Sequence, residues 1–334
     1  MPSVELTLLG MTLAGALVTV YCLCSHHHLI FAAAPSSLAA SDLRWRWGEK
    51  GSRSGVGGRA FLFCYRLVAF AWTAWVLGSL MLRRAGGGGA NAVARLYTFY
   101  TVWNYTLQAV WWLVGTACSA AALCGPRGPP RWLRLLAHAL LSVCLPASVL
   151  VSIVLWSVLL PADWSAGHHE RDLNFYSYSM HALNTLMLYF EWYVDRLLLK
   201  PAALWLLLSW CLLYAIAVWL HHDLTSPHFW PYFFFDQSSW VAVPWLLALL
   251  GLHLLVYGAV HLLSRCKARA LSGVHAVELL QEAEADPMAA ARSDHILDAA
   301  PTLWLDAGPG AGTLLAHPCA LPPALGEQRG GRSA

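Results

Sequence analysis

Long apolar runs separated by short polar stretches dominate the hydropathy pattern of this chain. A helix that crosses a membrane needs about 20 consecutive, mostly apolar residues. Seven segments meet this requirement: 6–24, 61–82, 96–124, 132–160, 175–199, 202–220 and 240–263. They are too long for the strands of a membrane β-barrel, and they do not alternate in polarity. The pattern predicts an all-α, polytopic transmembrane helix bundle of about seven spans.

The spans divide the chain into three predicted regions. Residues 1–60 hold the first span and a basic, Gly/Ser-rich loop, residues 61–264 form a six-helix membrane core, and residues 265–334 follow as a tail. The first apolar segment is long for a signal peptide, and no basic residues precede it, so we expect it to be a retained span. The tail is rich in Ala, Gly, Pro and charge, which predicts a largely disordered cytosolic segment.

Composition excludes several classes of protein. Only 12% of the residues are charged, whereas a soluble domain carries about 25%. The net charge of +3 is small and lies mostly in loops, which argues against a nucleic-acid partner. The nine cysteines are odd in number and fall mostly inside spans, so no disulfide framework is expected.

The distribution of Lys and Arg predicts the orientation of the bundle. Basic residues are more numerous in the loops after spans one, three and five, and at the start of the tail, than in the loops after spans four and six. Only Arg83, Arg84 and Arg95, around a glycine run, oppose this trend. We expect an integral, multi-pass protein of the endoplasmic reticulum or plasma membrane, with its carboxyl terminus in the cytosol.

Two stripes of polar residues lie inside the predicted spans. Thr101, Asn104 and Gln108 are spaced so that they share one face of the third span. A second stripe follows the fifth span with the same helical spacing: His181, Asn184, Leu188, Glu191 and Asp195. Because lipid cannot satisfy polar groups, we expect the stripes to face each other or a cavity.

Thr101 and His181 lie at similar depths, about 8 Å below the outer boundary by helix rise. A hydroxyl and an imidazole in a water-poor site form a nucleophile and a general base that could cleave an ester. The alternative is structural: intramembrane Thr often bonds its own backbone, and His or Asn often bridges helices. Arg66, on the second span, is a candidate partner of Glu191 or Asp195 in the same structural sense.

The histidine clusters do not predict a metal site. His26–His28, His168–His169 and His221–His222 lack the spacing that sets two ligands beside a carboxylate on one helix face. We interpret them, and the single histidines inside the spans, as interfacial or hydrogen-bonded core residues. The aromatic run 230–235 is a candidate lid over the outer end of the bundle.

Several of these residues resemble landmarks of the androgen-induced and androgen-dependent membrane protein family. The stretch 101–108 is similar to that family's Thr followed by Gln seven residues later, and the stretch 180–191 to its His followed by Glu ten residues later. Three further elements match in the same order: Leu145-Pro146 with Trp156, Trp219-Leu220-His221-His222, and Trp230-Pro231-Tyr232-Phe233. The extra first span, the Gly-rich loop, the long tail, Asn184 and Tyr232 depart from the family's pattern.

This resemblance implies an intramembrane hydrolase of fatty acid esters of hydroxy fatty acids. The family's nucleophile and base fall on Thr101 and His181. Asn104, Gln108, Asn184, Glu191 and His222 are candidates for supporting residues, with Asn104 or Asn184 donating to the oxyanion. We expect a lipid substrate that enters from the bilayer, and no cofactor or metal.

A non-enzymatic role remains the main alternative. Tyr65-Arg66-Leu67 and the stretch 181–184 are also similar to the rolling stone family, which is associated with cell fusion and adhesion. There the polar stripes would only hold helices together. A seven-helix receptor or light-driven protein is disfavoured, because the seventh span has no Lys for a Schiff base and the third has no Asp-Arg-Tyr-like element.

Overall fold

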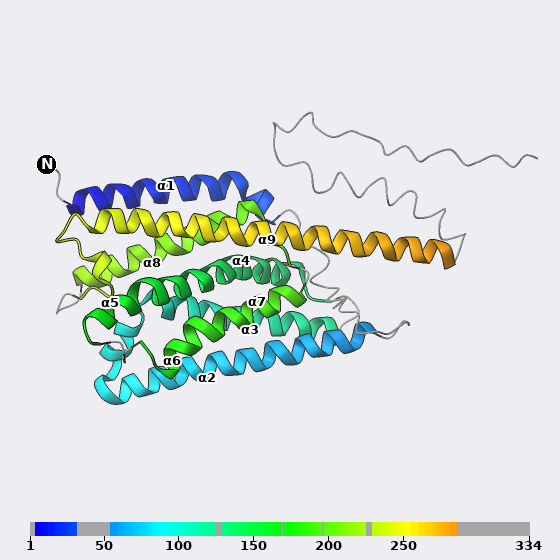
Figure 1. Cartoon of the computed structure of the whole chain (residues 1–334), viewed down its shortest axis with the longest axis horizontal. Helices are drawn as coiled ribbons and strands as arrows, with labels where there is room; N and C mark the ends of the chain where they lie inside the picture. Colours follow the sequence, from blue (N-terminus) through cyan, green and yellow to red (C-terminus); the bar gives the residue numbers. More distant parts are fainter. Residues whose placement is uncertain are drawn as a thin grey trace, which may run out of the picture. The chain divides into compact units, whose positions relative to one another are not determined.

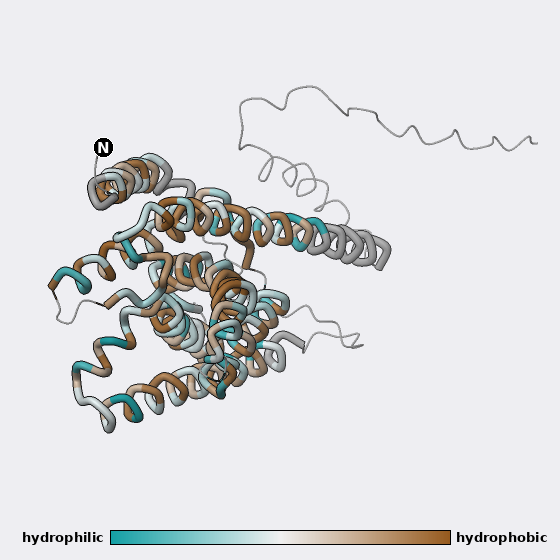
Figure 2. Tube along the Cα trace, turned by 60° about the vertical axis from the view of Figure 1, so that its left-hand side comes forward, coloured by the Kyte–Doolittle hydropathy of each residue, from teal (hydrophilic) through white to brown (hydrophobic). Residues whose placement is uncertain are grey.

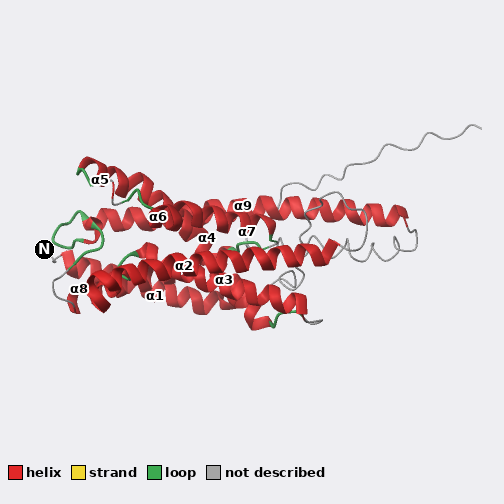
Figure 3. Ribbon diagram, turned by 90° about the horizontal axis from the view of Figure 1, so that it is seen from below, coloured by secondary structure: helices red, strands yellow, loops and turns green. Residues whose placement is uncertain are grey.

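The computed structural model describes residues 4–31, 54–124, 128–168, 170, 172–195, 197–224 and 229–285. Over these residues the regular structure is helical, without strands (Figure 3). The α-helices within this part of the chain are α1 (Val4–Phe31), α2 (Ser54–Leu96), α3 (Tyr100–Cys124), α4 (Arg131–Val154), α5 (Leu160–Ser165), α6 (Phe175–Ser177), α7 (Asn184–Val194), α8 (Leu204–Leu224) and α9 (Ala242–Ala285). The predicted all-α bundle is confirmed.

Among the described residues, six helical segments are long and apolar enough to cross a membrane, and they correspond to all the predicted spans except the fifth. Hydrophobic residues predominate along these helices in Figure 2. The fifth segment is also helical, because α6, a π-helix (Tyr178–Leu183) and α7 follow one another without a break. Length and composition therefore define an integral, multi-pass membrane protein.

Helix α3 packs against both α2 and α4 (Figure 1). Its residues Trp111 and Trp112 are fully buried, and they share a core with Leu141 and Leu145 of α4 and Leu188 of α7. Helix α1 packs against α8. The first span belongs to the same compact unit, Met1–Arg269, as α2 to α8 and the part of α9 up to Arg269.

The boundary between the second and third spans differs from the prediction. Helix α2 continues through the glycine run to Leu96, with a break at Gly89, where φ is 64°. This left-handed backbone is one that glycine adopts without steric strain. Helix α3 begins only at Tyr100, so Thr101 lies in its first turn and not five residues inside a helix that starts at residue 96.

The fifth span is shorter than predicted, because α7 ends at Val194 and not near residue 199. Its start matches the prediction, since the Asn174 side chain caps the first turn by accepting bonds from Tyr176 and Ser177 nitrogens. The segment 197–200 that follows is not helical, yet its carbonyls accept bonds from side chains of α4 and α9: Lys267 to Leu197, His138 to Leu198, His261 to Leu199 and Tyr257 to Lys200. Irregular backbone at membrane depth is tolerated where protein satisfies it in this way.

Two further boundaries differ. The fourth span passes from α4 into a π-helix (Leu155–Leu159) and then α5. Helix α9 continues past residue 264 to Ala285, so the tail does not begin with irregular structure. The disorder predicted for the rest of the tail concerns residues 286–334, which lie outside the described part of the chain. Residues from Ala270 onward form a second unit by their contacts.

Candidate functional site

His181 lies in the π-helix Tyr178–Leu183 and is buried. Its ring Nδ1 is 3.0 Å from the carbonyl oxygen of Val151 on α4. A carbonyl can only accept, so Nδ1 carries the proton and Nε2 keeps its lone pair. The carbonyl of His181 itself accepts a bond from Ser152 Oγ. Contacts to α4 therefore fix the ring in the tautomer that a general base requires.

π-Helices occur on both segments that contribute to the His181–Val151 hydrogen bond. The ring of His181 comes from one π-helix, while the Val151 carbonyl lies one turn before the other, Leu155–Leu159. π-Helices are rare, and they occur frequently at functional sites. The inserted residue in each widens the helix locally and redirects the side chains around it.

Thr101 is partly buried in the first turn of α3. The amino end of a helix leaves backbone N–H groups without intrahelical partners. Here the hydroxyl oxygen of Tyr232 accepts a bond of 3.1 Å from the Tyr100 nitrogen, and it also interacts with Thr101. The loop between α8 and α9 therefore brings Tyr232 beside Thr101.

Two cavities share part of their walls at these residues, and this shared wall is called the junction of the cavities below. The apolar cavity, of about 480 Å³, lies among α1, α3, α4, α8 and α9. The polar cavity, of about 970 Å³, lies at one end of the bundle, and its walls include five charged residues: Arg83, Arg84, Asp163, Glu170 and Asp172. The residues that line both cavities are Thr101, Leu159, His181 and Tyr232.

The remaining supporting residues lie elsewhere. The Asn104 amide donates to the Tyr100 carbonyl at 2.8 Å and accepts from Trp210 Nε1 at 3.0 Å. The Asn184 amide donates to the Met180 carbonyl at 2.6 Å, and Gln108 reaches the Asn184 carbonyl at 3.5 Å. None of the three is among the residues that line either cavity. The structure uses these amides to connect backbone and neighbouring helices.

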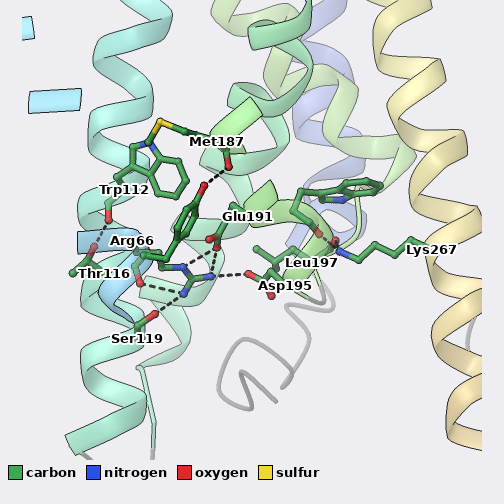
Figure 4. Close-up of polar contacts among 12 residues, drawn as sticks. Arg66, Trp112, Thr116, Ser119, Met187, Glu191, Asp195, Leu197 and Lys267 are labelled. Atoms are coloured by element: carbon green, nitrogen blue, oxygen red, sulfur yellow. Dashed lines mark hydrogen bonds and ion pairs between the residues drawn. The ribbon is translucent and has the colours of Figure 1, made fainter. Parts of the chain in front are cut away.

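Glu191 belongs to a separate buried cluster of charges (Figure 4). Arg66 Nε donates to Glu191 at 2.8 Å, and Arg66 Nη2 lies 2.5 Å from Glu191 and 2.7 Å from Asp195. Arg66 Nη1 donates to Ser119 Oγ at 2.7 Å. The predicted pairing of Arg66 is confirmed with both carboxylates. Glu191 is ten residues from His181, or about 15 Å along the helix, so it does not reach the cavities.

His222 also lies away from the junction of the cavities. Its ring stacks on Trp230 with centroids 3.7 Å apart, and Nδ1 is 3.2 Å from Asp223. Three histidines inside the spans bond to oxygen acceptors: His138 to Leu198, His253 to Leu249 and His261 to Leu199. In the described part of the chain, no three His, Cys, Asp or Glu side chains group as metal ligands would.

Sequence reasoning missed the position of Tyr232 beside Thr101 and the gathering of charges around the polar cavity. The aromatic run 230–235 was expected to cover the outer end, and Tyr232 and Phe233 do line the polar cavity. Arg83 and Arg84, which oppose the charge asymmetry of the loops, line the same cavity. A basic pair that opposes the charge asymmetry of the loops is the sequence signal that could have drawn attention to this cavity.

The chain matches no protein-family model, no curated protein and no solved structure.

Proposed function

We propose that this protein is an intramembrane hydrolase of amphiphilic carboxylic esters, with Thr101 as nucleophile and His181 as general base. The observation that carries the proposal is the junction of the two cavities, which both side chains line. The bond from His181 Nδ1 to Val151 leaves Nε2 as the basic nitrogen. The resemblance of stretches 101–108 and 180–191 to the androgen-induced family points to the same pair.

The chemistry proceeds in two halves, and the proton balance closes in each. His181 Nε2 takes the proton of Thr101 as Oγ attacks the ester carbonyl, and it returns that proton to the leaving alcohol. This leaves an acyl group on Thr101. Water then attacks the acyl carbonyl while His181 accepts its proton, and the return of that proton to Thr101 Oγ releases the acid.

The two cavities support an amphiphilic ester as the substrate class. A volume of about 480 Å³ lies within the usual range for small-molecule sites, about 300–1,000 Å³. Its lining is dominated by apolar side chains, which suits an acyl chain. The charged walls of the polar cavity suit the polar part of the same molecule. An ester bond between the two parts would then lie at Thr101 and His181.

Activity-based labelling tests this proposal directly. The purified full chain is treated with a fluorophosphonate probe, and the adduct is mapped by mass spectrometry. A hydrolase gives one adduct, on Thr101, and heat-denatured protein gives none. Thr106 is the internal control, because its hydroxyl donates to the Val102 carbonyl of its own helix. A folded protein without an adduct would favour the alternative, a non-enzymatic protein of rolling stone type.

We also infer that the loop from His221 to Ser239 faces away from the cytosol and that the carboxyl terminus lies in the cytosol. Pro231, Tyr232 and Phe233 of this loop line the polar cavity. Lys and Arg asymmetry supports this orientation. In a background without native cysteines, Ser238→Cys should react with an impermeant thiol reagent from the outer or lumenal side. Arg265→Cys, near the other end of the α9 span, should react only from the cytosolic side. The reverse pattern would overturn the orientation.

A further inference from the structure

Tyr232 is held in a fixed position at the junction of the cavities. Its ring contacts Phe99 edge-on, with centroids 5.7 Å apart, and stacks on Phe234 at 4.9 Å. Its hydroxyl oxygen accepts the bond from the Tyr100 nitrogen at the start of α3. Aromatic packing therefore orients the phenol, and the backbone of the helix that carries Thr101 anchors its oxygen.

The Tyr232 hydroxyl differs from those of the other tyrosines beside the apolar cavity. Tyr214 donates its proton to the Thr98 carbonyl at 2.6 Å, and the Tyr100 hydroxyl contacts Cys211 and His253. No backbone carbonyl among the described residues accepts from Tyr232. The Tyr232 hydroxyl also interacts with the hydroxyls of Thr101 and Tyr214. Because a hydroxyl, unlike a carbonyl, can itself donate or accept, these contacts leave the O–H group of Tyr232 able to turn toward a ligand.

The start of α3 strengthens this donor. The amino end of a helix carries a partial positive charge, and backbone N–H groups there polarise the group that accepts from them. Burial raises the pKa of Tyr232 to about 12, so the phenol keeps its proton at neutral pH. The group that faces the cavities is therefore a polarised, neutral hydroxyl.

We propose that the Tyr232 hydroxyl donates the hydrogen bond that stabilises the oxyanion formed when Thr101 attacks an ester. This inference rests on the proposed hydrolase function and extends it. Thr101, His181 and Tyr232 line both cavities, and the proposal places one reacting carbonyl among the three side chains. Tyr232 transfers no proton, and it supplies a donor whose orientation does not change during the reaction. The Asn104 and Asn184 amides, committed to protein partners, do not compete for this role.

The test is Tyr232→Phe in the full-length protein, purified and reconstituted in lipid nanodiscs. Hydrolysis of a long-chain p-nitrophenyl ester is measured beside Thr101→Ala. Loss of one oxyanion donor lowers kcat by about 10²–10³-fold, and we expect that loss with KM changed less than about threefold. Tyr105→Phe is the matched control, because Tyr105 lies on α3, lines neither cavity and should leave kcat unchanged.

The outcomes separate the two proposals. If the wild type hydrolyses the ester, Thr101→Ala does not, and Tyr232→Phe keeps kcat within tenfold, the Tyr232 role is wrong and the hydrolase function stands. An inactive, folded wild type overturns both. If Tyr232→Phe does not fold, the role of Tyr232 is tested instead with a fluorinated tyrosine at position 232, by measuring activity against pH. Its lower phenol pKa should move the alkaline loss of activity to lower pH, and an unmoved profile contradicts the role.

Discussion

Alanine at Thr101 or His181 is expected to abolish ester hydrolysis and probe labelling, by at least about 10⁴-fold, in a protein that still folds. Each change removes one member of a catalytic unit, and such members are strongly non-additive. The double variant should therefore lose little more than either single one. Thr101→Ser should retain part of the activity, because it keeps the hydroxyl. Turnover and labelling rates on purified, monodisperse protein provide the measurement.

Thr106→Ala is the control for this series. The Thr106 hydroxyl bonds to the Val102 carbonyl of its own helix and contacts the Tyr97 hydroxyl, and it lines neither cavity. It should leave activity nearly unchanged. If Thr101 and His181 served only to join helices, both alanine variants would lower the thermal midpoint, and neither wild-type position would carry an adduct. Full labelling of a well-folded Thr101→Ala protein would exclude the mechanism.

Arg66→Met is expected to destabilise the bundle by about 3–5 kcal/mol, the usual result of removing one partner from a buried ion pair. The change leaves Glu191 and Asp195 buried without their shared cation. Glu191 is fully buried, and its second oxygen has no hydrogen-bond partner in the described structure. The thermal midpoint in a single detergent, read beside that of the wild type, provides the measurement.

Two companion variants sharpen this comparison. Arg265→Ala removes an exposed cation and should change the midpoint little. Adding Glu191→Gln and Asp195→Asn to Arg66→Met removes the orphaned charges and should recover much of the loss. An unchanged midpoint for Arg66→Met alone would mean that the charge cluster does not stabilise the fold.

Features that depend on the solvation of single groups could be predicted from the sequence. Apolar length predicted the spans, because each helix must cover the hydrocarbon layer. The partners of Arg66 followed from the energy of an unpaired charge in lipid. Helical spacing likewise placed Thr101 and His181 on polar stripes of two different spans, and their similar expected depth brought the two together as candidates.

Features that depend on tertiary contacts could not be predicted. The end of α7 at Val194 requires side chains of α4 and α9 to satisfy the segment 197–200. The π-helix around His181 has no signature in composition. Tyr232 reaches the start of α3 from 132 residues away in sequence. Asn104 and Asn184 have the right chemistry for an oxyanion hole, but the fold engages their amides elsewhere.

The apolar cavity is bounded by α1, α8 and α9, all three of them long and apolar enough to lie in the bilayer. In the proposed reaction, an ester that occupies this cavity would enter from the lipid phase. Each buried methylene group of such an ester would favour its partition into the bilayer by about 0.8 kcal/mol. For the proposed reaction, the governing quantity is then the mole fraction of ester among the surrounding lipids and not its concentration in water. Membrane composition itself would set the rate, since inert lipid dilutes the substrate in two dimensions.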